Sequence, residues 1–300
     1  MTQQVSAASR PLDPAAATLA VVLCLSWGLN QVAIKLALPE LPPLTQAAFR
    51  STVGALIVLI WARTRGVVLM GADGTLVPGV AAGLLFGLEF MLIFRGLMWT
   101  DASRASLFIY TAPFFVVIGS RWFIPGDRFG RSQWLGLALS FTGIAVAFGM
   151  PAAQSDTRAL LGDLMLVAAG AAWGATTLVV KGSRLAQTSY EKTLFYQLIV
   201  SAPLLAVAAQ LSGERVMTPP SALAIASLLY QTVWVVGITY LAWFALILRY
   251  SASRLSVFTF LTPLFGVAAG NFVLGEPVST AFVLAAVLVV AGLALVNRPG

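Results

Sequence analysis

The sequence predicts an all-α membrane protein in which ten transmembrane helices form two inverted five-helix repeats around a central cavity. Three observations lead to this fold class. Hydrophobic residues make up 59% of the 300 residues and charged residues only 10%, whereas a soluble domain carries about 25% charge. The apolar residues form runs of about 20, the length that a helix needs to cross a bilayer. Phrases from the first half of the chain also return in the second half.

Proline, glycine and charged residues divide the chain into ten apolar segments, each expected to be one helix. The expected helices are 16–38, 44–62, 76–99, 102–124, 132–150, 160–186, 190–211, 222–249, 252–274 and 278–296. The first repeat is therefore expected at 16–150 and the second at 160–297, with a linker at 151–159. Residues 1–15 are polar and are expected to form a disordered tail. A cleaved signal peptide is the alternative, but the apolar run that follows is longer than the apolar core of a signal peptide.

The basic residues predict the orientation in the membrane. If the chain starts inside, about twelve Lys and Arg residues lie at cytoplasmic helix ends and about five at the opposite ends, as the positive-inside rule requires. Both termini are therefore expected in the cytoplasm. The net charge of +7 does not indicate nucleic-acid binding, because the basic residues are scattered and form no dense patch.

Two phrases carry the repeat. Trp27-Gly28 returns as Trp173-Gly174, and the segment ASRASLFIYTAPFFVV at 102–117 returns as ASRLSVFTFLTPLFGV at 252–267, with roughly half of the positions identical. Similarity at a long fixed spacing indicates duplicated structure. Because five helices are an odd number, the two copies insert upside down relative to each other, an arrangement typical of secondary transporters. The alternative is a duplication that serves packing alone.

The chain resembles the drug/metabolite transporter superfamily, and within it the ten-helix EamA-type proteins. The residues that carry this resemblance are Trp27-Gly28, Trp173-Gly174, the Ala-Ser-Arg segments that end at Pro113 and Pro263, Gly275-Glu276-Pro277, Gly136, Gly143 and Gly292. The resemblance covers nearly the whole chain. It implies a carrier in which the first four helices of each repeat surround a central cavity and the fifth helices lie outside. It also implies export, and the chain is most similar to bacterial amino-acid exporters of the inner membrane, including the aromatic amino-acid group.

Two charged residues are expected within the bilayer. Arg50 lies about seven residues into its helix and Glu89 about ten residues before the end of its helix, so both fall between the outer end and the midplane. A charge at this depth needs a partner or an aqueous cavity. Glu89 is a candidate to bind a proton or the ammonium of a substrate, and the alternative is a structural ion pair with Arg50 or a neighbour. Lys35 and Lys181 lie near helix ends and are expected to reach the membrane interface.

A polar pair follows each Trp-Gly phrase. The pair is Asn30 and Gln31 in the first repeat and Thr176 and Thr177 in the second. These side chains are expected to hydrogen-bond either a substrate or a neighbouring helix. We expect Asn30 or Gln31 to face the cavity, because both are bulkier and more polar than threonine.

Matched glycines and prolines are candidate hinges of a gate. Gly28 and Gly174 weaken their helices or permit close approach of a neighbour. Pro113 and Pro263 lie within expected helices, and each removes one backbone hydrogen bond. The alternative is that the prolines only curve the wall of the cavity.

Aromatic residues are plentiful on the helices expected to surround the cavity. A mostly apolar cavity with few polar groups suits amino acids and similar small molecules, and aromatic faces can also hold a cation. The aromatic residues predicted to contact a substrate are Phe90, Tyr110, Trp173, Tyr196, Trp234, Tyr240, Trp243 and Phe258.

Several kinds of chemistry are not expected. The chain has no histidine and one cysteine, Cys24, and it carries neither a Cys/His metal spacing nor a phosphate-binding loop. We therefore predict no metal, no cofactor and no enzyme activity. The expected partners are a small-molecule substrate and the lipid bilayer, without nucleic acid or an obligate protein partner. Sugar-phosphate or nucleotide-sugar carriers would need more central cations than Arg50 alone, while a drug or metabolite carrier, a scramblase, a channel or a structural bundle remain alternatives to amino-acid export.

Overall fold

The computed structural model describes residues 13–123, 131–148, 157–249, 258–259 and 261–296. Regular structure in these residues is helical throughout, with no strand among them, so the all-α fold class is confirmed. Six helices of the described chain are each long and apolar enough to cross a membrane. These are Pro14–Ala37, Pro43–Thr64, Leu76–Gly96, Thr157–Lys181, Tyr190–Leu211 and Ala222–Trp243.

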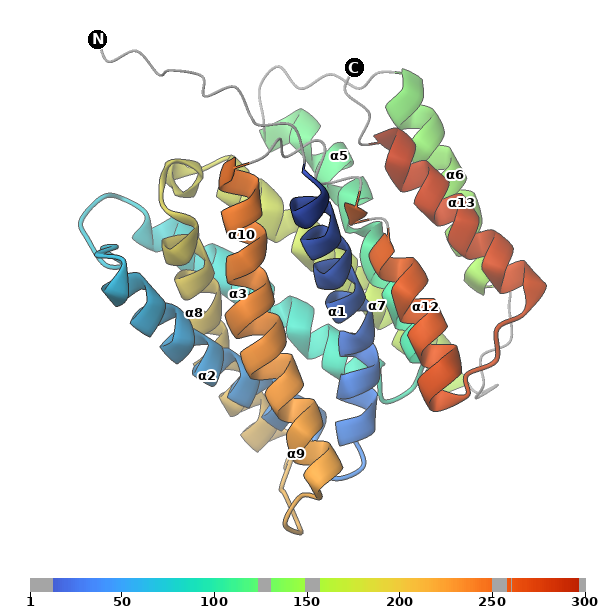
Figure 1. Ribbon diagram of the computed structural model, residues 1–300, viewed down its shortest axis with the longest axis horizontal. Coiled ribbons are helices and arrows are strands. Elements are labelled where there is room, and N and C mark those ends of the chain that lie inside the picture. Colours follow the sequence, from blue (N-terminus) through green and yellow to red (C-terminus); the bar gives the residue numbers. More distant parts are fainter. Residues whose placement is uncertain (1–12, 124–130, 149–156, 250–257, 260, 297–300) are drawn as a thin grey trace.

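The described helices of the first half are α1 (Pro14–Ala37), α2 (Pro43–Thr64), α3 (Leu76–Gly96), α4 (Ala102–Phe108), η1 (Ile109–Thr111), α5 (Ala112–Phe123) and α6 (Arg131–Phe148). Those of the second half are α7 (Thr157–Lys181), η2 (Arg184–Gln187), α8 (Tyr190–Leu211), α9 (Ala222–Leu229), η3 (Tyr230–Thr239), α10 (Tyr240–Arg249), α12 (Leu261–Leu274) and α13 (Thr280–Val296). In Figure 1, α1 begins and α13 ends at the same upper end of the bundle. We call this the terminal end and the opposite one the far end.

The helices pack in pairs that correspond between the two halves. In one wall of the molecule α7 packs against α3 and α5, and in the other α1 packs against α9, η3 and α12. We call these the first wall (α3, α4, η1, α5 and α7) and the second wall (α1, α9, η3, α10 and α12). Helices α2 and α8 pack against each other beside both walls. Helices α6 and α13 form a separate pair at one side of the bundle (Figure 1).

Two equivalent glycines allow close helix contacts within the walls. A Cβ atom added to Gly28 in α1 would lie 2.7 Å from the backbone nitrogen of Gly266 in α12. One added to Gly174 in α7 would lie 2.7 Å from Cβ of Phe115 in α5. Both α1 and α7 continue as α-helices through these glycines. The two contacts occupy matching places in the two walls, and close packing of small residues is how helices associate in membranes.

The helix expected at 102–124 is interrupted, which corrects the prediction of one continuous helix. α4 ends at Phe108, the 3₁₀ turn η1 follows, and α5 begins at Ala112. The reason is Pro113, which has no N–H to donate to the carbonyl of Ile109 and whose ring would clash with that carbonyl. The chain therefore tightens from about 3.6 to about 3.0 residues per turn before the proline.

The helix expected at 222–249 runs through α9, η3 and α10, but its central ten residues are π-helical. Hydrogen bonds in a π-helix join residues five apart instead of four. The side chains of η3 therefore point in other directions than an α-helical projection places them. This change of register affects which aromatic residues of this span reach the interior.

Several boundaries differ from the expected ones. α1 begins at Pro14, inside the expected tail, because the Asp13 carboxylate accepts a hydrogen bond from Ala16 N at 2.8 Å and proline fits the first helical turn. α7 begins at Thr157, inside the expected linker, and ends at Lys181 instead of 186, before η2. The first part of the helix expected at 252–274 lies outside the described residues, as do 124, 149 and 150.

Candidate functional site

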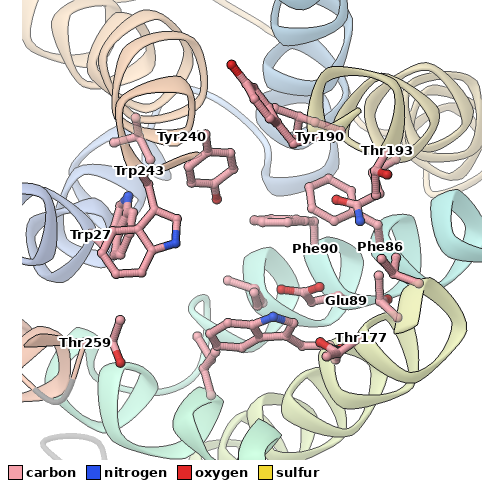
Figure 2. A pocket seen from close by; sticks show the side chains of 18 of the residues that line it. Trp27, Phe86, Glu89, Phe90, Thr177, Tyr190, Thr193, Tyr240, Trp243 and Thr259 are labelled. Atoms are coloured by element: carbon pink, nitrogen blue, oxygen red, sulfur yellow. Dashed lines mark hydrogen bonds between the residues drawn. The ribbon is translucent and has the colours of Figure 1, made fainter. Parts of the chain in front are cut away.

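A cavity of about 640 Å³ lies between the two walls. Residues of α1, α2, α3, η1, α5, α7, η2, α8, η3, α10 and α12 line it, whereas the described parts of α6 and α13 contribute none. Figure 2 shows aromatic side chains and a few polar ones pointing into this space from several helices. A concave, mostly apolar space with a few polar groups is typical of a small-molecule site.

The cavity opens at the terminal end of the bundle. Its lining reaches Lys181 at the end of α7, Ala186 in η2, and Thr188 and Tyr190 at the start of α8. Lys181 and Ala186 are exposed. We call Lys181, Ala186, Thr188 and Tyr190 the mouth.

The far end is closed around Glu276, whose side chain is 5% exposed. Gly275 has a φ of 68°, a left-handed conformation that glycine adopts readily, and it turns the chain after α12. The Glu276 carboxylate then accepts hydrogen bonds from Ala102 N at 2.7 Å, from Ser103 N at 2.8 Å and from Ser103 Oγ at 2.7 Å. Because Glu276 follows α12 and Ala102 begins α4, these bonds join the two walls.

Lys35 completes the closure of the far end. Its Nζ donates to the carbonyl oxygen of Thr100 at 2.8 Å and lies 3.4 Å from Glu276 Oε1. Carboxylates and a carbonyl within the protein thus bind the Lys35 ammonium at the far end, and its position at the membrane interface stays a prediction. We call Lys35, Thr100, Ala102, Ser103 and Glu276 the closing network.

A buried ion pair holds α4 in place beside this network. The guanidinium of Arg104 donates through Nε to both Asp163 oxygens at 3.1 Å, and Nη2 also contacts Oδ2. Thr100 Oγ1 donates to Asp163 Oδ1 at 2.5 Å. Arg104 is 4% exposed and Asp163 1% exposed. The pair ties α4 to α7 within the first wall and so positions the backbone donors of Ala102 and Ser103.

Arg50 and Glu89 both lie at the centre of the cavity lining. Arg50 is 1% exposed, donates from Nη2 to the Tyr240 hydroxyl at 3.1 Å, and stacks 3.9 Å over the Phe90 ring. Its Nε and Nη1 have no hydrogen-bond partner in the described chain. Glu89 is 6% exposed and points into the cavity (Figure 2). Among the described ion pairs, none within 4.0 Å includes Arg50 or Glu89, but the Arg50 charge acts electrostatically on the Glu89 carboxyl.

The two polar pairs all line the cavity but differ in their bonding. Thr176 and Thr177 donate to backbone carbonyls of their own helix, at 2.9 Å and 3.0 Å. In contrast, Asn30 Oδ1 and Gln31 Oε1 are buried and have no hydrogen-bond partner among the described residues. A buried carbonyl oxygen without a donor is costly, so Asn30 and Gln31 have unused acceptors beside the cavity.

The aromatic lining forms two clusters. Trp27 packs edge-on against Trp243, with ring centroids 5.2 Å apart, and against Tyr240 at 6.4 Å. On the other side Tyr110 and Trp173 meet edge-on at 5.7 Å. Figure 2 shows Trp27, Tyr240 and Trp243 across the cavity from Glu89. Phe90 also lines it and packs against Phe86, with ring centroids 4.6 Å apart, so five predicted aromatic residues belong to the lining together with Trp27, Phe86 and Tyr190.

Three aromatic residues predicted to contact a substrate lie elsewhere. The Tyr196 ring packs on α3 at Gly79, and its hydroxyl lies 3.4 Å from Thr75 Oγ1. Trp234 belongs to the π-helical segment and donates from Nε1 to Ser26 Oγ at 2.9 Å. Phe258 packs against a cluster of α1 and α10. None of the three belongs to the lining.

The predicted hinge residues differ in position. Pro113 lines the cavity directly after η1, whereas Pro263 is buried in the first turn of α12. Gly28 and Gly174 lie at the helix contacts described above. Their role in gating stays a prediction.

Several polar residues of the lining were not predicted from the sequence, namely Thr188, Thr193, Gln197, Thr259 and Thr262. Their signal was a small polar side chain in or beside an apolar span, but threonine in membrane helices also bonds its own backbone. Among the described residues, no group of three or more His, Cys, Asp or Glu side chains is placed to hold a metal ion.

The comparison with protein families gives one match. The EamA-like transporter family matches residues 14–149 and 160–298, so nearly the whole chain is covered in two parts. A solved crystal structure with 23% sequence identity superposes with a TM-score of 0.67, covering 94% of this chain and 96% of its own. This likeness supports the fold.

Curated relatives are similar over most of their length. The chain is 24% identical to the uncharacterized transporter YoaV of Bacillus subtilis, over 91% of this chain and 93% of that protein. It is 28% identical to a probable amino-acid metabolite efflux pump of Salmonella typhimurium, over 92% of both chains. A protein of the same name in Escherichia coli is 27% identical, again over 92% of both.

Proposed function

The chain belongs to the EamA-like transporter family, and on this basis we propose that it is a secondary transporter that exports amino acids or related small metabolites across the bacterial inner membrane by alternating access. In this proposal ten helices cross the membrane as two inverted five-helix repeats, and both termini lie in the cytoplasm. The mouth then faces the cytoplasm and the closing network faces outward.

The observation that carries the proposal is a cavity that is open at one end and closed at the other by bonds between the two walls. Alternating access needs a site that is reached from one side at a time. Two halves of similar structure and opposite orientation can exchange conformations around such a site. The walls are built from corresponding helices, which supports this exchange.

The chemistry of the lining supports an amino acid over a phosphorylated solute. Arg50 at the centre and Lys181 at the mouth are the cationic residues of the described lining, and they lie on different helices at different depths. A phosphate site gathers several cations on one group. The names of two relatives refer to amino-acid metabolites, and aromatic walls suit the side chain of a neutral amino acid.

Counterflow in proteoliposomes tests the proposal. Vesicles would be loaded with one unlabelled compound, and uptake of a radiolabelled trace of that compound would be measured against empty liposomes. The panel contains neutral, acidic and basic amino acids, a sugar phosphate and a nucleotide sugar.

We expect saturable counterflow for neutral amino acids and none for the phosphorylated compounds. Absence of counterflow for every amino acid would overturn the substrate assignment. Flux that rises linearly with concentration without saturating would indicate a channel, and rapid movement of a fluorescent lipid between leaflets would indicate a scramblase.

A further inference from the structure

The centre of the cavity holds two opposite charges, Arg50 and Glu89, which act on each other electrostatically but form no salt bridge within 4.0 Å in the described structure. Glu89 has no hydrogen bond in the described structure, and neither residue belongs to an ion pair there. Arg50 has one hydrogen-bonded nitrogen and two without a partner. Both side chains are more than nine-tenths buried and belong to the lining. Buried charges are costly unless they are paired, and in membrane proteins they mark a functional site.

The unpartnered polar atoms of the lining divide in the same way. Asn30 Oδ1 and Gln31 Oε1 are unused acceptors, which suit an ammonium with three N–H donors. The two unpaired nitrogens of Arg50 are donors, which suit a carboxylate. The cavity therefore offers acceptors on α1, a negative charge on α3, and donors with a positive charge on α2.

We propose that this centre binds a zwitterion, with its ammonium at Glu89 and its carboxylate at Arg50. The side chain of the substrate lies against the cluster of Trp27, Tyr240 and Trp243, which faces Glu89 across the cavity (Figure 2). A compound with only one of the two charges leaves Glu89 or Arg50 buried and unpaired. The site thus selects α-amino acids with uncharged side chains over the corresponding amines and acids. This inference rests on the proposed function, since it specifies the substrate of the same cavity.

The absence of a second charge pair in the other repeat fits a site with a defined polarity. The residue that corresponds to Glu89 is Thr239, which accepts a hydrogen bond from Trp27 Nε1 at 2.8 Å. The residue that corresponds to Arg50 is Tyr196, which packs outside the lining. Each charge therefore comes from the first repeat alone, so the substrate has one orientation in the cavity.

Competition by charge-deleted analogues tests the proposal in the wild-type protein. Counterflow of labelled L-phenylalanine would be inhibited with L-phenylalanine, 2-phenylethylamine and 3-phenylpropionate, and the same series would be built on L-leucine. We expect each analogue to inhibit at a concentration about tenfold or more above that of the amino acid, because it forgoes a charge-assisted interaction. Equal inhibition by an amino acid and either analogue would overturn the proposal.

Variants then assign the two charges. Glu89→Gln is expected to lower the affinity for the amino acid by about tenfold and to leave inhibition by 3-phenylpropionate unchanged. Arg50→Gln is expected to lower the affinity for the amino acid to a similar extent and to leave inhibition by 2-phenylethylamine unchanged. Glu40→Gln is the matched control, because it makes the same change in a loop outside the cavity.

Two outcomes separate this inference from the proposed function. If amino acids show counterflow but both charge variants lose affinity for all three compounds alike, the transporter stands and the zwitterion site falls. If no amino acid shows counterflow, the proposed function itself fails. Should Glu89→Gln or Arg50→Gln not fold, as judged by thermal unfolding in detergent, the wild-type competition series still decides.

Discussion

Lys35 and Lys181 end the first helices of the two repeats, but their surroundings differ. Lys35 binds the Thr100 carbonyl and the Glu276 carboxylate inside the closing network. Lys181 lies exposed at the mouth, at the other end of the bundle. Equivalent residues of two similar halves thus stand in a closed end and an open end. Under the proposed alternating access, this difference makes the structure one of two states, and the contacts of the far end predict how the mouth closes.

The largest expected effect comes from breaking the ion pair that supports the closed end. Arg104→Ala leaves the Asp163 carboxylate buried without its guanidinium, which costs about 3–5 kcal/mol. Thermal unfolding in detergent measures the loss. The matched control is Arg184→Ala near the mouth, an exposed side chain that donates to the Asp73 carbonyl at 3.3 Å, with an expected cost below about 1 kcal/mol. Equal losses of thermal stability in Arg104→Ala and Arg184→Ala would contradict the difference between the two ends.

The second prediction changes the two lysines themselves. Lys35→Met loses the ammonium bonds of the closing network and is expected to favour the state that is open at the far end, by about tenfold. Lys181→Met is expected to shift the equilibrium the other way, because the exchange of halves gives Lys181 the closing role at the mouth.

Cysteine labelling measures this shift. Ser106→Cys, buried beneath the closing network, and Thr188→Cys, at the mouth, would report in a Cys24→Ala background. Lys35→Met should raise labelling at 106, while Lys181→Met should lower it and raise labelling at 188. A shift in the same direction for both lysine variants would contradict the comparison.

A smaller effect is expected for the two equivalent tryptophans. Trp27 Nε1 donates to Thr239 Oγ1 at 2.8 Å, whereas no hydrogen bond joins Trp173 to Glu89 in the described structure, although these two residues correspond to the first pair. Trp27→Phe should therefore favour the state that is open at the far end, and Trp173→Phe the state that is open at the mouth. Each change in the equilibrium between the two states is expected to be about two- to tenfold. The same two cysteine reporters measure both. Identical labelling of the two cysteine reporters in Trp27→Phe and Trp173→Phe would contradict this prediction.

The smallest effect concerns the loop after α2. Lys192 Nζ donates to Asp73 Oδ2 at 2.5 Å, and with the Thr75 hydroxyl this bond holds the pKa of the Asp73 carboxyl well below its usual range. A carboxyl with a lowered pKa in the folded state stabilises the fold above its unfolded pKa of about 3.9 and loses that contribution as the pH falls. We expect Asp73→Asn to unfold at a lower temperature than wild type at pH 7, with the difference shrinking below about pH 4. A difference independent of pH would contradict this role.

Much of the fold could be predicted from the sequence, because membrane spans follow from apolar length alone. The repeated Trp-Gly phrases identified the two helices whose glycines make matching contacts, Gly28 with α12 and Gly174 with α5. The π-helical segment of η3 could not be predicted, because it contains no proline and its bonding depends on packing. The turn η1 could have been predicted, since Pro113 disturbs the helical turn that precedes the proline.

The candidate site was predictable where polarity is unusual for its depth. Asn30, Gln31 and Glu89 are polar groups in apolar spans, and all three line the cavity. Aromatic residues carry no such signal, since tryptophan packs equally well between helices, at the interface or against a ligand. Trp234 was therefore assigned to the cavity although it bonds Ser26 from outside the lining. The closing network was not predicted, because its carboxylate and donors come from segments that lie far apart in the sequence and that only the folded chain brings together.

Distances between spin labels test the central claim most directly, namely that the mouth and the far end open in turn. One labelled pair would span the mouth, at Thr18 in α1 and Gln187 in η2, and a second would span the far end, at Met98 and at Phe272 in α12. All four residues are exposed, and the Cys24→Ala background removes the native thiol. The account predicts two distance populations for each pair, with Lys35→Met lengthening the far-end distance and shortening the mouth distance by matching fractions of molecules. A far-end distance that stays fixed while the mouth distance changes would contradict it.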